Sequence, residues 1–105
     1  PKINTGFFAS LVEMKDVMAT FAGHDHDNDY IGMLYNVGLA FGRVSGWDAY
    51  GDFERGGRII ELREGKFEFD SWIRTSSGKE YTYYYPSGLT SKDEETMEFL
   101  SLIHI

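Results

Sequence analysis

The hydrophobic positions at the start of the chain first follow the spacing of a helix and then run together as a strand. The apolar residues with helical spacing are Phe7, Phe8, Leu11 and Val12. Steps of one, four and five residues place them on one face of a short helix, which Asn4 or Thr5 would cap and residues 14–16 would end. Residues 17–22 are uncharged and rich in β-branched and aromatic side chains, so they predict a buried strand.

Further strands follow this first one. Residues 30–37 and 39–44 predict two strands of mixed apolar character. Residues 58–63 and 66–74 form the clearest hairpin pattern of the chain, with residues 64–65 as a two-residue turn. The strands are therefore expected to be mainly antiparallel.

The last part of the chain ends the sheet and begins a second helix. Residues 81–86 are extended and predict an edge strand, because Pro86 cannot donate a hydrogen bond to a central ladder. Ser91 and Glu94 form a capping box for a helix in the tail. We therefore predict an α/β fold of mainly antiparallel strands with a helix at each end, divided into a domain over residues 1–90 and a helical tail over residues 91–105.

Composition narrows the class of protein. A chain of 105 residues forms one domain at most, and 42% hydrophobic with 16% aromatic residues exclude a disordered segment. The net charge of −7 argues against nucleic acid and anionic membranes as partners, because both need a basic surface. The absence of cysteine removes disulfides and thiolate metal sites. No apolar run has the length of a transmembrane helix and no targeting segment is present, so localisation stays open.

The densest chemistry lies in the run Gly-His-Asp-His-Asp-Asn-Asp at residues 23–29, directly after the first predicted strand. Polar side chains at the end of a strand lie at the mouth of a sheet, where open α/β folds usually bind ligands. If the backbone stays extended, His24 and His26 point to the same side. Because neutral imidazole is a common ligand of zinc and also suits iron and manganese, the pair predicts part of a metal site.

This run has two other interpretations besides metal binding. Clustered His, Asp and Asn residues also form an ordinary solvated turn, which stays open. The acidic residues at positions 25, 27 and 29 match the start of an EF-hand calcium loop. However, Tyr30 stands where that loop requires glycine, and Asn36 stands where it requires glutamate. An EF-hand is therefore excluded.

Residues 23–26 resemble the last metal-binding motif, Gly-His-x-His, of the calcineurin-like metallophosphoesterases. The wider pattern is similar to the branch with purple-acid-phosphatase-like phosphohydrolases, and the similarity covers roughly residues 3–75. The residues that carry it are Asn4 to Phe8, Leu11 to Glu13, Asp16, Val17, Phe21 to Tyr30, Gly42, Arg43, Gly46, Tyr50, Gly51, Arg55, Gly56 and Arg58 to Ile60.

This resemblance implies part of an α/β sandwich that holds two divalent or trivalent metal ions, from among Fe, Mn, Zn and Mg, and acts on a phosphate-ester substrate. Such metals polarise the phosphoryl oxygens and activate a bridging hydroxide. By the same resemblance, His24 would bind one metal and His26 the other. Asp25, Asp27 and Asn28 would support these ligands or shape their loop.

Glycines alternate with aromatic residues over residues 42–57, a composition typical of a shaped loop. Arg43, Tyr50 and Arg55 are candidates for the rim of a substrate site, because a guanidinium fork matches a phosphate group. Arg58 is a weaker candidate, since it opens a predicted strand. A long hairpin connection with packed aromatic rings is the alternative interpretation.

The sequence also departs from the family pattern. The earlier family motifs, Asp-x-His, Gly-Asp-x-x-Asp and Gly-Asn-His-Asp or Gly-Asn-His-Glu, have no match in these 105 residues, and the first residue is Pro1. We therefore expect the C-terminal portion of a larger enzyme, inactive alone and assembled as a dimer or larger through its exposed edges. The alternatives are a non-catalytic module that binds one divalent ion and a β-rich oligomerising domain.

Overall fold

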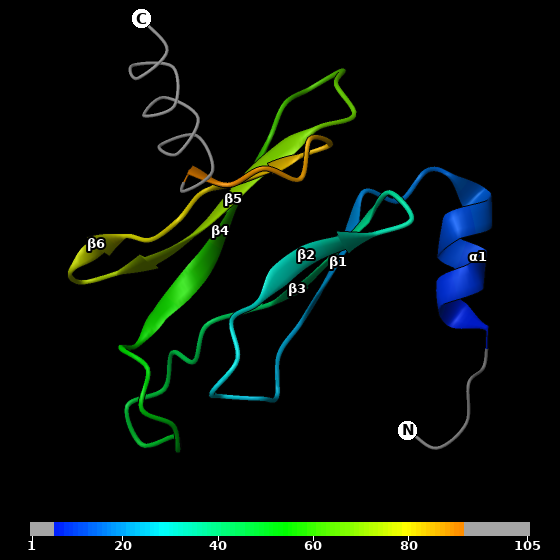
Figure 1. Ribbon diagram of the computed structural model, residues 1–105. Coiled ribbons are helices and arrows are strands. Elements are labelled where there is room, and N and C mark those ends of the chain that lie inside the picture. The colour runs from blue at the N-terminus through cyan, green and yellow to red at the C-terminus, as the bar shows by residue number, and fades with distance from the viewer. Residues whose placement is uncertain (1–5, 92–105) are drawn as a thin grey trace, which may run out of the picture.

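A computed structural model describes residues 6–91, which form a helix and two sheets in three layers. The helix α1 spans Phe7–Met14, and the first sheet contains β1 (Ala19–Ala22), β2 (Ile31–Leu34) and β3 (Val37–Phe41). The second sheet contains β4 (Gly56–Leu62), β5 (Phe69–Thr75), β6 (Gly78–Lys79) and β7 (Tyr83–Tyr85). The first sheet lies between α1 and the second sheet (Figure 1).

This arrangement confirms the predicted fold class, because all but one of the strand pairings are antiparallel and the two sheets form part of an α/β sandwich. The exception is β1, which pairs in parallel with the central strand β3, while β2 pairs with β3 in the antiparallel direction. The predicted tail helix, like nearly all of the segment 91–105, lies outside the described residues.

The first helix is confirmed, but its cap is not the predicted one. The residue at its N-cap is Gly6, in the left-handed conformation with φ of 78°, and no side chain caps the helix. Asn4 and Thr5 precede the described residues. Glycine adopts a positive φ without steric cost, so it suits this N-cap position. No residue of α1 is buried, and Phe7 remains 66% exposed.

The strands of the first sheet differ from the prediction in two ways. A turn at Tyr35 and Asn36, with φ values of 47° and 65°, divides the predicted strand 30–37 and makes β2 and β3 a hairpin. Two successive positive φ values match the twist of a two-residue hairpin turn. The predicted buried strand 17–22 is instead an edge strand, β1, that starts at Ala19 and ends on the exposed Phe21 and Ala22.

The hairpin of β4 and β5 is confirmed, although its connection is longer than two residues. The turn at residues 64–65 is present, because the Lys66 amide donates a hydrogen bond to the Arg63 carbonyl at 3.1 Å. Ladder pairing, however, begins only at Leu62 and Phe69. Alternation along β5 then places Phe69, Ser71, Ile73 and Thr75 on its buried face.

The core lies between the two sheets and is centred on aromatic side chains of the second one. Phe69, 1% exposed, stacks on Tyr85 with the ring centroids 5.2 Å apart. Gly38 of β3 faces this ring so closely that an added Cβ atom would lie 3.6 Å from Phe69 Cζ and 3.0 Å from Ala19 Cβ. Small residues on the first sheet therefore let the large rings of the second sheet fill the space between them.

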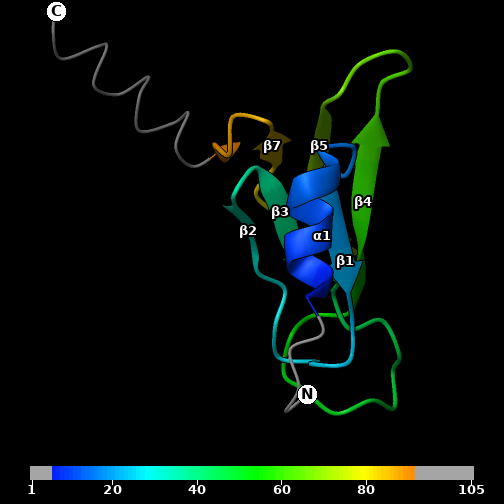
Figure 2. The same ribbon diagram turned by 90° about the vertical axis from the view of Figure 1, so that its right-hand side faces the viewer.

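The loop that follows β1 and the loop between β3 and β4 lie side by side at one end of the sandwich, as both ribbon views show (Figures 1 and 2). Within residues 6–91, the structure contains no helix of the length and hydropathy needed to cross a membrane. The paired loops carry the candidate site.

Candidate functional site

The histidine-rich loop is a series of turns rather than a continuation of β1. The Asp25 side chain accepts a hydrogen bond from the Asp27 amide at 3.2 Å, and the Asn28 side chain accepts one from the Tyr30 amide at 3.0 Å. His24 has a φ of 88°, a rare conformation for a residue with a side chain. The extended geometry that would align the two imidazoles by alternation is therefore not present.

The two histidines nevertheless meet at one cavity of about 230 Å³. The residues that line this cavity are Gly23, His24, Asp25, His26, Gly42, Arg43, Val44, Ser45, Gly46 and Ala49. His24 is exposed and His26 is half-buried. The tertiary fold, which places the β3–β4 loop opposite the histidine loop, thus brings together side chains from two separate segments.

Tyr50 contacts both histidines of the motif. Its ring stacks on the His26 imidazole at a centroid distance of 3.9 Å and an interplanar angle of 14°. Its backbone carbonyl lies 2.9 Å from His26 Nδ1, and its hydroxyl donates a hydrogen bond to the His24 carbonyl at 3.3 Å. The sequence predicted Tyr50 for a substrate rim, whereas the structure places it against the predicted metal ligands.

Close backbone contact holds these two loops together. Gly51 has a φ of 111°, and an added Cβ atom there would lie 3.0 Å from Asp27 Oδ1 and 3.1 Å from His26 Cβ. The same Asp27 oxygen accepts a hydrogen bond from the Asp52 amide at 3.2 Å. A side chain at position 51 would be strained by this φ value and would press against Asp27 and His26, so glycine is strongly favoured there.

Arg43 joins the histidine loop to the second sheet. Its Nη2 donates hydrogen bonds to Asp29 at 2.6 Å and Glu80 at 2.7 Å, and its Nη1 donates to the Glu54 carbonyl at 2.8 Å. Burial acts to lower the pKa of Arg43, but hydrogen bonds and charge from Asp29 and Glu80 raise it on balance. The side chain is 5% exposed, and its buried Nε has no hydrogen-bond partner among the described residues.

Arg55, also predicted for the substrate rim, is directed at the protein backbone. It donates hydrogen bonds to the carbonyls of four residues in one loop: Gly46, Ala49, Gly51 and Phe53. A guanidinium group has five N–H donors, so most of its hydrogen-bonding capacity is already used. Arg55 thereby fixes the shape of the loop that carries Tyr50.

Arg58 connects the two sheets and is not directed at a substrate site. Its guanidinium donates to the Phe41 carbonyl at 2.8 Å, the Asp29 carbonyl at 2.7 Å and Ser71 Oγ at 3.1 Å. Burial lowers its pKa, with Asp29 acting in the opposite direction. Sequence reasoning missed Asp29 and Glu80 as arginine partners, because they lie 14 and 37 residues from Arg43 and no local pattern signals such pairs.

The described residues offer a metal ion two imidazoles at this site but not a complete set of ligands. Within residues 6–91, no group of three or more His, Cys, Asp or Glu side chains could hold a metal ion. Zinc sites use at least three protein ligands. The donor chemistry of His24 and His26 fits a metal, but the described part of the chain provides only part of a site.

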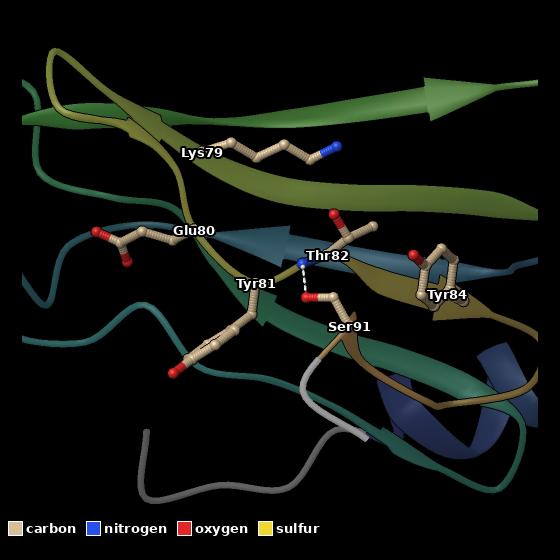
Figure 3. A pocket seen from close by; sticks show the side chains of 6 residues that line it. All are labelled: Lys79, Glu80, Tyr81, Thr82, Tyr84 and Ser91. Carbon is tan, nitrogen blue, oxygen red and sulfur yellow. Dashed lines mark hydrogen bonds between the residues drawn. The ribbon is translucent and has the colours of Figure 1, made fainter. Parts of the chain in front are cut away.

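A larger depression lies elsewhere, on the second sheet, and contains no histidine. Its volume is about 730 Å³ and it is lined by Lys79, Glu80, Tyr81, Thr82, Tyr84 and Ser91 (Figure 3). Ser91 Oγ accepts a hydrogen bond from the Thr82 amide at 3.0 Å, which joins the two ends of segment 82–91 (Figure 3). Size alone does not make it the functional site, because the concentrated chemistry lies at the smaller cavity.

Comparison with known proteins identifies relatives among purple acid phosphatases. The chain is 36% identical over 74 residues to Probable inactive purple acid phosphatase 14 of Arabidopsis thaliana, covering 69% of this chain and 18% of that protein. Probable inactive purple acid phosphatases 29 and 28 of the same plant are 37% identical over 78 residues and 39% identical over 72 residues. These matches cover 72% and 67% of this chain, and 20% and 18% of the relatives.

The chain thus spans about a fifth of the length of the curated relatives it matches. No protein-family model and no solved structure matches it. Over this short region, the chain is related to proteins named as purple acid phosphatases, which supports a metallophosphoesterase-like relationship.

Proposed function

We propose that this chain is the C-terminal portion of a dinuclear metallophosphoesterase of the purple-acid-phosphatase-like branch, to which it contributes His24 and His26 as metal ligands. The observation that carries the proposal is that both histidines line one cavity, with His26 Nδ1 at 2.9 Å from a backbone carbonyl. An imidazole bound in this way keeps its other nitrogen for a metal. The relatives named as purple acid phosphatases support the assignment.

The remaining ligands would come from other parts of the whole protein. When bound, two metal ions supply Lewis-acid polarisation of a phosphate ester and lower the pKa of a bound water molecule. Asp25, Asp27 and Asn28 shape the loop that presents the histidines, through their hydrogen bonds to backbone amides. Arg43 lines the same cavity, but its Nε is buried and its Nη atoms bind Asp29, Glu80 and the Glu54 carbonyl, so we assign it to the wall of the cavity that positions the histidine loop.

Calorimetric titration of the chain with Zn²⁺ or Mn²⁺ tests the ligand assignment. We expect one weak site per chain, with affinity weaker than micromolar, because two imidazoles completed by water form an incomplete coordination shell. His24→Ala and His26→Ala should each abolish this binding, whereas His104→Ala, the matched control at the third histidine, should leave it intact. The absence of binding at millimolar metal would instead identify the loop as an inert turn.

Catalysis by the chain alone is a separate question. Turnover of a chromogenic phosphate ester should be undetectable, since a bridged pair of metals cannot form on two histidines. Metal-dependent turnover by the pure chain, abolished by His24→Ala, would contradict the proposal of a partial site. The whole protein should contain Asp-x-His and Gly-Asn-His motifs ahead of this region.

A second candidate function is a non-catalytic module that binds a single metal ion or oligomerises. The observation that favours it is the name of these relatives, each of which is called a probable inactive purple acid phosphatase. Sub-micromolar affinity for one ion per chain, without hydrolysis by the whole protein, would favour this second function.

A further inference from the structure

Tyr50 touches the metal-ligand motif through three different groups. Its ring covers the His26 imidazole, its carbonyl faces His26 Nδ1 at 2.9 Å, and its hydroxyl reaches the His24 carbonyl at 3.3 Å. These contacts come from a residue that is 24 positions from His26 in the chain. They restrict the orientation of the imidazole about its own side-chain bonds.

The contact between His26 Nδ1 and the Tyr50 carbonyl also selects one tautomer of the His26 imidazole. A backbone carbonyl can only accept a hydrogen bond, so the proton of a neutral His26 must be on Nδ1. The lone pair is then on Nε2. Histidines that bind metals usually donate their other N–H to a carbonyl or carboxylate, which fixes both the tautomer and the ring direction.

The loop that presents this carbonyl is shaped by Arg55. The guanidinium donates to Gly46 O, Gly51 O and Phe53 O at 2.9 Å each, and also to Ala49 O. Two of these acceptors flank Tyr50 directly. Asp27 fastens the same loop from the other side, by accepting a hydrogen bond from the Asp52 amide.

We propose that Arg55 and Tyr50 are positioning residues, in which Arg55 folds the 46–53 loop so that the Tyr50 carbonyl holds His26 as the Nδ1–H tautomer. Nε2 is thereby offered to a divalent metal ion. The metal step of this inference rests on the proposed function, whereas the tautomer and the role of Arg55 do not. The inference replaces substrate binding with ligand orientation as the role of both residues.

Nitrogen NMR of the metal-free chain at alkaline pH, where imidazole is neutral, measures the tautomer directly. In the wild type, His26 should be predominantly Nδ1–H. In Arg55→Lys it should shift towards the Nε2–H form that free histidine favours, because lysine has a single donor group and cannot bind four carbonyls. Arg74→Lys is the matched control, since Arg74 is an exposed arginine on β5, and it should keep the wild-type tautomer.

A second variant keeps the test decisive if Arg55→Lys does not fold. Gly51→Ala introduces a Cβ atom 3.1 Å from His26 Cβ at a φ of 111°, so it should push the loop away from the imidazole and cause the same shift. Folding is checked by the amide signals of the core strands. An Nε2–H tautomer in the wild type, or no shift in whichever of the two variants folds, would overturn the inference.

A zinc titration of the same proteins separates this inference from the proposed function. Loss of the fixed tautomer should weaken zinc binding by about 10- to 100-fold, as for other groups that orient a metal ligand. If the wild type does not bind zinc, the proposed function fails while the tautomer result still decides the roles of Arg55 and Tyr50. If zinc binds through His24 and His26 but the variants keep the tautomer, only the positioning role fails.

Discussion

The ring of Phe69 joins the two sheets. It stacks on Tyr85 within its own sheet and makes an edge-on contact with Phe21 of β1, at a centroid distance of 5.9 Å. Aromatic pairs in these arrangements contribute about 0.5–1.5 kcal/mol beyond the burial of their surface. Phe69 therefore has a larger role in stability than its position in a predicted hairpin suggested.

Phe69→Ala should lower the free energy of unfolding by about 3–5 kcal/mol, because it removes a buried ring and leaves a cavity between the sheets. Urea denaturation followed by circular dichroism measures the loss. Phe7→Ala is the matched control, since Phe7 is 66% exposed on α1 and should cost less than about 1 kcal/mol. Equal losses for both variants would mean that the core is not centred on Phe69.

At the scale of elements, the loop between β3 and β4 is an ordered part of the structure. Arg55, which belongs to this loop, donates hydrogen bonds to the carbonyls of Gly46 and Gly51, and Arg43 donates one to the Glu54 carbonyl. The Glu54 side chain accepts hydrogen bonds from the Ser77 amide at 3.0 Å and from Ser77 Oγ at 2.8 Å. The loop is thereby attached to the turn between β5 and β6.

Glu54 should make the attachment of this loop sensitive to acid. Hydrogen bonds from Thr75 and then Ser77 lower the pKa of Glu54 from 4.5 to about 2. Because the folded-state pKa is the lower one, the stabilisation is fully present above pH 4.5 and is lost as the pH falls towards 2. Glu54→Gln should therefore show a smaller drop in melting temperature over this range than the wild type.

The matched control for that experiment is Glu64→Gln, at an exposed turn position between β4 and β5. Its melting temperature should fall with pH as steeply as that of the wild type. If Glu54→Gln also follows the wild-type curve, the carboxylate does not hold the loop. The expected difference is small, since Glu54 is exposed and solvent screens its interactions.

At the scale of the whole molecule, one flank of the sandwich is open. The strands β1 and β4 are the edges of their sheets and lie along the same flank (Figure 2). Ile60 and Leu62 share the inner face of the second sheet with Ser71 and Phe69, yet they are 42% and 66% exposed. Phe21 of β1, the edge strand of the first sheet, is 39% exposed.

We propose that a second copy covers this flank when the chain is alone in solution. Unpaired strand edges beside apolar side chains favour strand addition between identical molecules. Light scattering at tens of micromolar should therefore show a dimer or larger. The double substitution Ile60→Lys and Leu62→Lys should give a monomer, because it places two charges on the open flank.

Trp47→Lys serves as the control for assembly, because Trp47 is 88% exposed and lies on the β3–β4 loop rather than on β4, so this variant should leave the dimer intact. A monodisperse monomer of 12.0 kDa for the unmodified chain would show that the small core is sufficient by itself. That result would contradict the expectation, drawn from both sequence and structure, that the sandwich needs further covering.

The sequence by itself determined the features that depend on local spacing. Helical periodicity placed α1, alternation and turn residues placed the β4–β5 hairpin, and a polar run after an apolar segment located the histidine loop. The hidden turn at Tyr35 was missed because a tyrosine at positive φ is not a usual turn signal. Local patterns suffice where neighbouring residues in the chain are also neighbours in space.

Only the tertiary structure decided what the arginines and Tyr50 contact. Arg43 was predicted to face a substrate and instead joins Asp29 to Glu80, while Tyr50 lies on His26. A guanidinium or an aromatic ring binds whichever partner the fold brings within a few ångströms, and those partners lie 14 to 37 residues away. Residue type therefore predicted the chemistry available at this site, and the packing of two loops at one end of the sandwich decided how it is used.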